Sequence, residues 1–211
     1  MSSVYVDVDD VLAQTGRMFL RLLAERFHRR VRWDDIRSYH LGESFGLGAE
    51  ELERFMAAAH EPEALLSIEP MPGAAEALAA WLESGYEVSV ITGRPPETRE
   101  VTLDWLRDRG LPFSRFHLLD KYSEFYDGAH GTPEGALRLE DLTGLDLCFA
   151  VEDFPGTTDY LARSLSVPVA LFDRPWNRGF EAGIGVVRCR DWGEVRECFD
   201  AASNPAPAET Y

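Results

Sequence analysis

The stretch Val4-Tyr5-Val6-Asp7-Val8-Asp9-Asp10-Val11 joins a short β-branched, apolar run to three closely spaced carboxylates. Such a run is typical of a buried strand that delivers side chains at its carboxyl end. In open α/β sheets, ligands bind just outside that end. The stretch therefore predicts a parallel sheet with a ligand site beside Asp7 and Asp9.

Similar apolar runs recur along the chain and alternate with helical patterns. This alternation indicates an α/β fold in which a Rossmann-like parallel sheet is wound on both faces. Further strands are expected at 87–92, 116–119, 146–151, 167–172 and, more weakly, 184–187, with helices at 74–83, 96–109 and 157–164.

One connection is too long for a simple crossover, since about sixty residues separate the first strand from Pro70. These residues carry apolar stripes of their own at helical spacing. We expect 15–69 to form a small helical cap inserted between the first and second motifs of an α/β core made of 1–14 and 70–202. Residues 203–211 have little apolar content and are expected to form a flexible tail.

Charge and composition exclude several classes of protein. The 37 acidic residues against 21 basic ones give a net charge of −16, which repels nucleic acid polymers. No apolar run approaches the roughly 18 residues of a membrane-spanning helix. Acidic residues begin at Asp7 and leave no room for a basic, apolar leader, so we expect a soluble, cytoplasmic protein.

Polar groups also follow three of the other predicted strands. Thr92-Gly93-Arg94 ends the second, Asp120-Lys121 the third and Glu152-Asp153 the fourth. A hydroxyl, an ammonium and several carboxylates at one sheet edge suit phosphoryl transfer. The carboxylates hold Mg²⁺ through hard oxygen ligands, and the metal offsets the charge of the phosphate.

Each polar group has an expected role in that chemistry. Asp7 attacks phosphorus to give an aspartyl-phosphate, while Asp9 protonates the leaving oxygen and later deprotonates water. Thr92 and Lys121 hold the phosphate oxygens as charge redistributes. Lys121 is the one Lys among 21 basic residues, which favours a site that needs a compact ammonium. Arg138 is the alternative cation, because the linker after Lys121 is long.

This ordered set of motifs resembles the phosphatases of the haloacid dehalogenase superfamily. The resemblance rests on Asp7-Val8-Asp9-Asp10-Val11, Thr92, Lys121 and Glu152-Asp153. It implies that Asp7 is nucleophile and metal ligand, and that Asp9 is general acid/base and gives Mg²⁺ its carbonyl. It also implies that Asp153 binds the metal directly, whereas Glu152 mainly supports the ligands without binding the metal itself.

Within the superfamily, the chain is similar to the 5'(3')-deoxyribonucleotidase branch in the cap, in Pro70-Met71-Pro72-Gly73-Ala74 and in residues 172–178. This similarity implies a nucleoside monophosphate as substrate, with a base that stacks on cap aromatics. Gly93, Arg94 and Arg174 are then candidates for the phosphate or ribose, although Arg94 and Arg174 are equally suited to ion pairs with acids. The cap aromatics are Phe19, Trp33, Tyr39 and Phe45.

The leading interpretation is a Mg²⁺-dependent phosphomonoesterase that is 5'-nucleotidase-like and acts on a small phosphorylated metabolite. The first alternative is a phosphatase for a sugar or other metabolite phosphate, since caps set specificity. The second is a non-catalytic nucleotide-binding protein of the same fold. Dehalogenation is disfavoured because it needs neither Asp9 nor a metal. The sequence leaves a monomer and a homodimer open.

Overall fold

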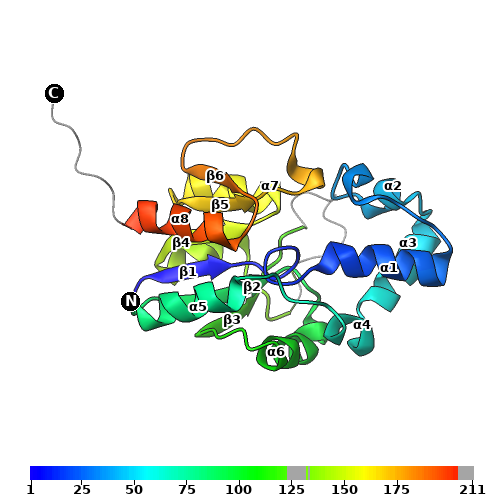
Figure 1. The fold of residues 1–211 in the computed structure, drawn as a ribbon, viewed down its shortest axis with the longest axis horizontal. Coiled ribbons are helices and arrows are strands. Elements are labelled where there is room, and N and C mark those ends of the chain that lie inside the picture. Colours follow the sequence, from blue (N-terminus) through cyan, green and yellow to red (C-terminus); the bar gives the residue numbers. More distant parts are fainter. Residues whose placement is uncertain (123–131, 133, 204–211) are drawn as a thin grey trace.

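A six-stranded parallel sheet forms the centre of the computed structural model, which describes residues 1–122, 132 and 134–203. Its strands lie in the order β3-β2-β1-β4-β5-β6, so the order reverses beside β1 (Figure 1). The predicted α/β sheet is confirmed, and the strand boundaries differ from the expected ones by at most two residues. The strands are β1 Ser3–Val6, β2 Glu87–Thr92, β3 Arg115–Leu118, β4 Leu147–Glu152, β5 Val169–Phe172 and β6 Val186–Cys189.

Helices cover both faces of this sheet. On one face, α5 (Ala74–Glu83), α6 (Arg99–Asp108) and α8 (Trp192–Ser203) pack on Val4 and Val6 of β1 and on their neighbours. On the other face, Tyr5 and Ile91 meet the 3-10 helix η3 (Leu139–Leu145) and the helical segment that begins with α7 (Pro155–Asp159). The alternation of Val4, Tyr5 and Val6 between the faces follows from the two-residue repeat of a strand.

The predicted helices differ from the observed ones in detail. The segment 96–109 begins as a 3-10 turn, η2 (Pro96–Thr98), before α6, and 157–164 is α7 continued by a π-helical turn, η4 (Tyr160–Ser164). The helix α8 was not among the predicted ones.

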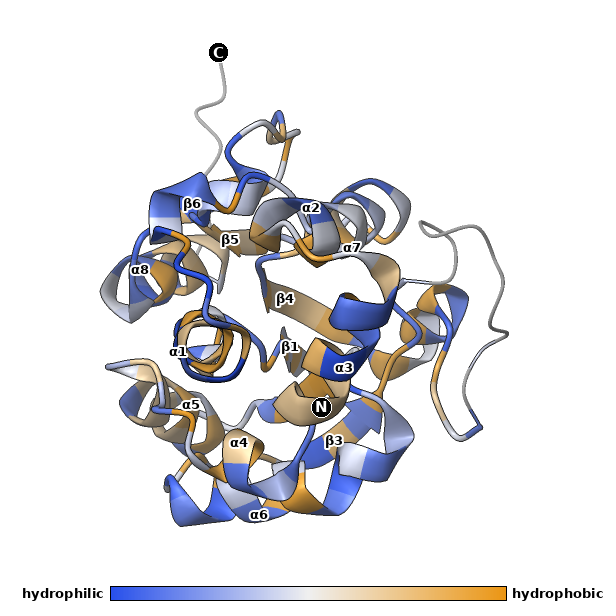
Figure 2. Ribbon diagram, turned by 90° about the vertical axis from the view of Figure 1, so that its right-hand side faces the viewer, coloured by the Kyte–Doolittle hydropathy of each residue, from blue (hydrophilic) through white to orange (hydrophobic). Residues whose placement is uncertain are grey.

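Four helices lie together beyond the carboxyl ends of the strands (Figure 1). Viewed from the side of these helices, β1 and β4 are seen behind them (Figure 2). The rings of Phe19, Phe45 and Phe55 pack edge to face, with centroids 5.4 to 6.5 Å apart, and form the core of this group. The elements are α1 (Thr15–Phe27), the 3-10 turn η1 (Trp33–Asp35), α2 (Leu41–Phe45), α3 (Ala49–Ala59) and α4 (Pro62–Leu66).

Two linkers connect these helices to the sheet and run side by side. The Gln14 amide donates to the Glu69 carbonyl at 2.9 Å, and the Met71 amide donates to the Leu12 carbonyl at 2.7 Å. We propose that the chain divides at these linkers into a core (1–14 and 70–202) and a cap (15–69). Ser203, the first residue of the expected tail 203–211, instead ends α8, and 204–211 lie outside the described residues.

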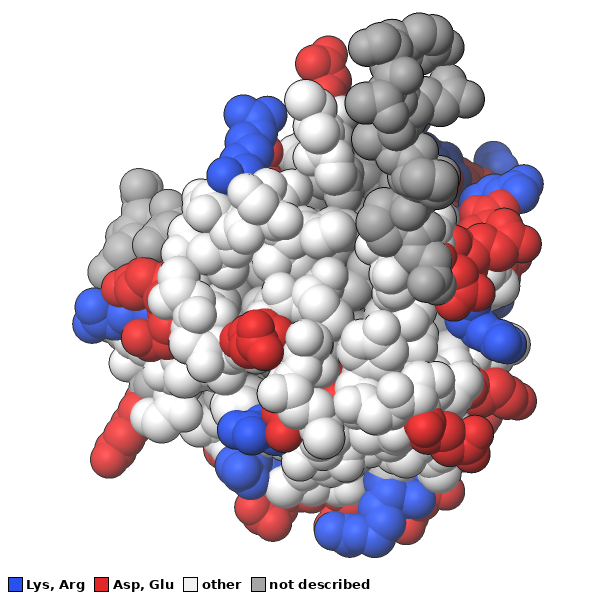
Figure 3. Space-filling view, turned by 90° about the vertical axis from the view of Figure 1, so that its left-hand side faces the viewer, with Lys and Arg blue, Asp and Glu red and all other residues white. Residues whose placement is uncertain are grey.

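The charge of the chain is spread rather than gathered on the face of the core turned away from α1–α4. Figure 3 shows single acidic and basic side chains scattered around a mostly uncharged surface on that side. Among the helices that the structure describes, none has the length and apolar character needed to cross a bilayer.

Candidate active site

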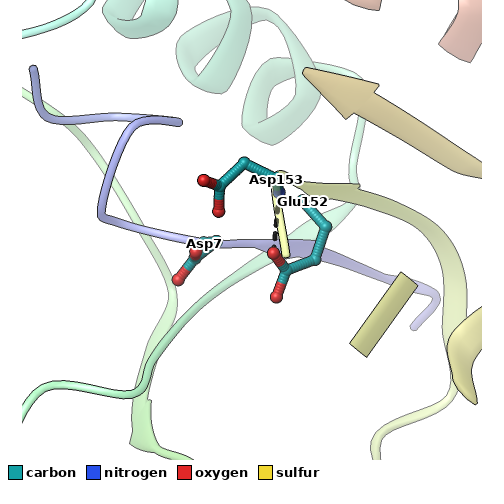
Figure 4. A group of neighbouring side chains, drawn as sticks. All are labelled: Asp7, Glu152 and Asp153. Atoms are coloured by element: carbon teal, nitrogen blue, oxygen red, sulfur yellow. Dashed lines mark hydrogen bonds between the residues drawn. The ribbon is translucent and has the colours of Figure 1, made fainter. Parts of the chain in front are cut away.

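Three carboxylates meet at the carboxyl edge of the two central strands. Asp7 follows β1, Glu152 ends β4 and Asp153 comes next, and one oxygen of each lies within 4.8 Å of the others (Figure 4). The meeting follows from the sheet, because β1 and β4 pair in parallel and therefore end together. All three side chains are buried.

Lys121 is the cation of this cluster. Its Nζ lies 2.8 Å from Asp7 Oδ1 and also contacts Glu152 Oε1, and its side chain is 1% exposed. Burial alone would lower the pKa of Lys121, but Asp7 and Glu152 raise it well above the ordinary value, so the ammonium keeps its proton. Arg138, the alternative, is exposed and lies 3.7 Å from Glu140.

Glu152 faces inward and organises its surroundings. Its Oε1 accepts the Tyr5 hydroxyl at 2.9 Å, and its Oε2 accepts the backbone amides of Asp153 and Phe154 at 2.7 and 2.9 Å. Both carboxylate oxygens are therefore already engaged by donors. This arrangement fits a group that holds Lys121 and the following loop in place behind the reacting atoms.

Asp153 has one engaged oxygen and one free one. Its Oδ2 accepts the Tyr39 hydroxyl at 2.7 Å and Trp176 Nε1 at 2.8 Å. Its Oδ1 is buried and accepts no hydrogen bond from the part of the chain that the structure describes. Burial, followed by the charges of Glu152 and Asp10, raises the pKa of Asp153 to about 8.

These features fit a divalent metal ion. Three buried carboxylates face one ammonium, so the cluster carries excess negative charge that a cation would offset. Asp153 Oδ1 is a buried, hard oxygen donor that none of the described residues engages. Asp7 and Asp153 are the side chains with which such an ion would bond.

The second motif lies beside the cluster. Thr92 ends β2 with no exposed surface, and its hydroxyl accepts the Arg94 amide at 3.2 Å. A Cβ on Gly93 would lie 2.8 Å from the Tyr122 ring and 3.2 Å from Lys121 Cδ. Gly93 is therefore the residue that lets Tyr122 and Lys121 approach β2 so closely.

The two predicted substrate arginines are engaged within the protein. The buried Arg94 forms an ion pair with the partly exposed Asp9, at 2.7 Å between Nη2 and Oδ1. Burial raises the pKa of Asp9, but the charge and hydrogen bonds of Arg94 outweigh it and hold that pKa below the ordinary value. Arg174 is also buried, and its Nε donates to the Asp10 carbonyl at 3.0 Å. Arg174 thus braces the turn after β1 from a buried position.

A cavity of about 810 Å³ opens above these groups, between the sheet and the cap helices. Phe19 and Phe45 line it as expected, although their rings also pack on one another. Tyr39 lines it too, but its hydroxyl is committed to Asp153. Trp33 is not part of the lining and packs on Trp176, with centroids 5.2 Å apart. The remaining cap lining is mostly aliphatic: Ile36, Leu41, Leu52, Met56, Ala59 and Leu65.

Sequence reasoning missed several groups at this site. His60 lines the cavity, although no sequence pattern marks it as a site residue. Trp176 and Tyr5 hold the acids of the fourth motif from positions remote in sequence. Nothing local marks these residues, because their role depends on tertiary contacts across more than twenty positions.

A protein-family model matches residues 1–121 of the chain, which is more than half of it. The family is described as 5' nucleotidase, deoxy (pyrimidine), cytosolic type C protein. The matched residues include the first three motifs, up to Lys121.

Two bacterial proteins, each named "putative nucleotidase", are similar over most of their length. The one from Halalkalibacterium halodurans is 27% identical over 195 residues, which cover 92% of this chain and 91% of that protein. The one from Oceanobacillus iheyensis is 26% identical over 192 residues, which cover 88% and 93%.

Solved structures share the fold at low identity. A predicted phosphatase from Clostridium acetobutylicum superposes with a TM-score of 0.63 at 12% identity and covers 94% of this chain and 97% of its own. A haloacid dehalogenase family hydrolase from Deinococcus radiodurans, solved with phosphate and sodium, gives 0.58 at 16% identity and covers 98% and 99%.

Proposed function

The chain belongs to the 5' nucleotidase, deoxy (pyrimidine), cytosolic type C family of haloacid dehalogenase-like phosphatases, and from this premise we propose that it hydrolyses nucleoside monophosphates with Mg²⁺ through an aspartyl-phosphate. The phosphatase assignment comes from the family itself. The substrate, the metal and the intermediate are the parts proposed here.

The observation that carries the proposal is the buried pair of Asp7 and Lys121 below the cavity. A nucleophilic carboxylate must accept a phosphoryl group without being repelled by it, so it needs a fixed positive charge close by. Lys121 Nζ lies 2.8 Å from Asp7 Oδ1 and is shielded from water. The compact ammonium also reaches Glu152, which fixes its position.

The reaction then proceeds in two displacements. Asp7 attacks phosphorus, the bond to the ester oxygen breaks, and that oxygen takes a proton from Asp9. Water next attacks the aspartyl-phosphate and gives a proton to Asp9. This attack releases phosphate and restores Asp7. Thr92 and Lys121 hold the phosphate oxygens through both steps.

Asp7, Asp153 and the Asp9 carbonyl are the groups proposed to bind Mg²⁺, with Glu152 supporting them. When bound, the ion supplies charge neutralisation for the phosphate among these acids. The side chains of the protein orient the nucleophile, exclude water beneath the cavity and transfer the proton at Asp9.

The cavity favours a nucleoside over a sugar as the leaving group. A sugar phosphate presents several hydroxyls, and each would lose its hydrogen bonds to water against the aliphatic side chains of the cap. A base offers a flat apolar face to Phe19 and Phe45, and needs few polar partners. His60 and Ser38 are polar cap side chains available to those few groups.

Phosphate release from a substrate panel tests this proposal. Deoxyribonucleoside and ribonucleoside monophosphates are compared with hexose and triose phosphates, each with Mg²⁺ and with EDTA. Asp7→Asn serves as the inactive control, because the amide keeps the shape but is not a competent nucleophile. Faster release from sugar phosphates would favour the alternative substrate class, and release from none would favour a binding protein.

A further inference from the structure

Arg94 is held in the interior by four acceptor contacts and leaves only 3% of its side chain exposed. Its Nε lies 3.1 Å from both oxygens of Asp9, and its Nη2 lies 2.7 Å from Asp9 Oδ1. Its Nη1 donates to the Thr102 hydroxyl at 3.1 Å, and Thr102 is fully buried on α6. Every nitrogen of the guanidinium therefore already has a partner within the protein.

The donors around Asp9 are distributed unequally between its two oxygens. Oδ1 receives the Thr15 hydroxyl at 2.5 Å as well as Arg94 Nη2 and Nε. Oδ2 has one contact in the described part of the chain, the 3.1 Å one from Arg94 Nε. The Asp9 side chain is still 29% exposed and lines the cavity. Oδ2 is therefore the oxygen with room to carry or accept a proton.

We propose that Arg94 is a positioning residue that acts through Asp9 and does not bind the phosphate or the ribose. The proposal rests on the function proposed above. Arg94 and Thr15 fix Oδ1, so that Oδ2 faces the cavity. Before the first displacement Oδ2 takes up a proton from water in the cavity; this proton passes to the leaving oxygen as the phosphorus–oxygen bond breaks, and in the second displacement a proton returns to Oδ2 from the attacking water.

The attachment of Arg94 to α6 explains why an arginine is used. A planar guanidinium can bind a carboxylate and a hydroxyl on different sides at once, whereas an ammonium provides only a point charge. The guanidinium thereby joins the loop after β1 to α6 through a buried link. Asp9 keeps one orientation because its partner is itself anchored at Thr102.

Leaving groups of different acidity separate this role from substrate binding. A nucleoside leaves as a basic alkoxide and needs a proton from Asp9, whereas p-nitrophenolate is a stable anion that leaves without one. The informative quantity is kcat/KM, since it ends with departure of the leaving group. Wild type, Arg94→Met, Arg94→Lys and the control Arg99→Met, which removes an exposed cation on α6, are compared on a nucleoside monophosphate and on p-nitrophenyl phosphate.

Arg94→Met is expected to lower kcat/KM for the nucleotide at least about tenfold, which is part of the 10²–10⁴-fold contribution of general acid catalysis. The same variant should lower kcat/KM for p-nitrophenyl phosphate far less. Arg94→Lys restores little, and Arg99→Met changes neither substrate. In an Asp9→Asn background, adding Arg94→Met causes no further loss, because the two residues act as a unit. Thr102→Val provides a milder variant with the same selective loss if Arg94→Met does not fold.

Equal losses on both substrates, with weaker inhibition by inorganic phosphate, would make Arg94 a phosphate ligand and overturn the proposal. Additive losses with Asp9→Asn would overturn it as well. If the wild-type protein released phosphate from neither substrate, the proposed function itself would fail, and the role of Arg94 would fall with it.

Discussion

The exchange of Lys121 tests the electrostatic centre at the scale of one side chain. Lys121→Met should lower turnover at least about a hundredfold, roughly 2.7 kcal/mol, which is typical for the loss of one preorganised contact. Lys121→Arg should recover only part of the lost turnover, because the larger, planar guanidinium must fit between Asp7 and Glu152 in a space that holds an ammonium. Turnover and a thermal melt are measured together. Wild-type activity in Lys121→Arg would contradict the assignment.

The ionisation of Asp153 makes metal binding depend on pH. Its pKa is raised to about 8, so below that pH an ion must displace a proton to bind. Burial raises the pKa of Asp7 as well, so Mg²⁺ affinity should rise with pH through the neutral range as these two carboxyl groups lose their protons. Isothermal titration across pH 6 to 9 measures this slope. Asp153→Asn, which lacks one of these two protons, should bind more weakly and with a shallower slope, and a slope as steep as that of the wild type would contradict the assignment.

At the scale of elements, the cap contributes Tyr39 to a carboxylate that belongs to the core. Tyr39 lies between η1 and α2 and donates to Asp153 Oδ2. Tyr39→Phe removes one of two donors to that oxygen, and outer partners of metal ligands typically affect affinity by 10–100-fold. We expect Mg²⁺ affinity to fall about tenfold. Tyr86→Phe, just before β2 at the opposite end of the sheet, is the control, and an equal loss there would mean a general effect of removing a hydroxyl.

A second element-scale prediction concerns the end of β2. In Gly93→Ala the new Cβ would lie 2.8 Å from the Tyr122 ring and 3.2 Å from Lys121 Cδ, so both side chains must shift. Turnover should fall at least about tenfold while the melting temperature changes little, since misplacement by an ångström costs on the order of 10²-fold. Gly144→Ala, which meets nothing within 4 Å, is the matched control.

The same elements show what the sequence predicts and what it does not. The six strands follow from apolar runs, and their shared edge follows from parallel pairing, so the meeting of Asp7, Lys121 and Glu152 was foreseeable. The hydrogen-bond donors to Asp153 could not be predicted, because Tyr39 and Trp176 reach it only once the cap and the loop after β5 have folded. For Arg94 the sequence leaves both the substrate and an ion pair with an acid open, because a motif does not reveal which neighbour a long side chain will meet.

For the molecule as a whole, the buried carboxylates of Asp7, Glu152 and Asp153 lower the stability of the fold, and a bound metal ion should raise it. An ion that binds only the folded protein adds about 2.7 kcal/mol at a concentration of 100 times its Kd. Raising Mg²⁺ from micromolar to millimolar should therefore increase the melting temperature, and EDTA should reverse the increase. Asp153→Asn should respond much less. An equal increase in that variant would mean that the ion binds elsewhere.

The position of β1 in the sheet bears on how the protein is made. β1, which precedes the proposed nucleophile Asp7, is the first strand of this sheet to be synthesised, yet it lies between β2 and β4, which come more than eighty and one hundred and forty residues later. Until β4 leaves the ribosome, the nascent chain has an apolar strand with one edge exposed, and such edges invite aggregation. Production of this protein should therefore depend on chaperones that shield early strands, and truncation before Leu147 should yield insoluble chains.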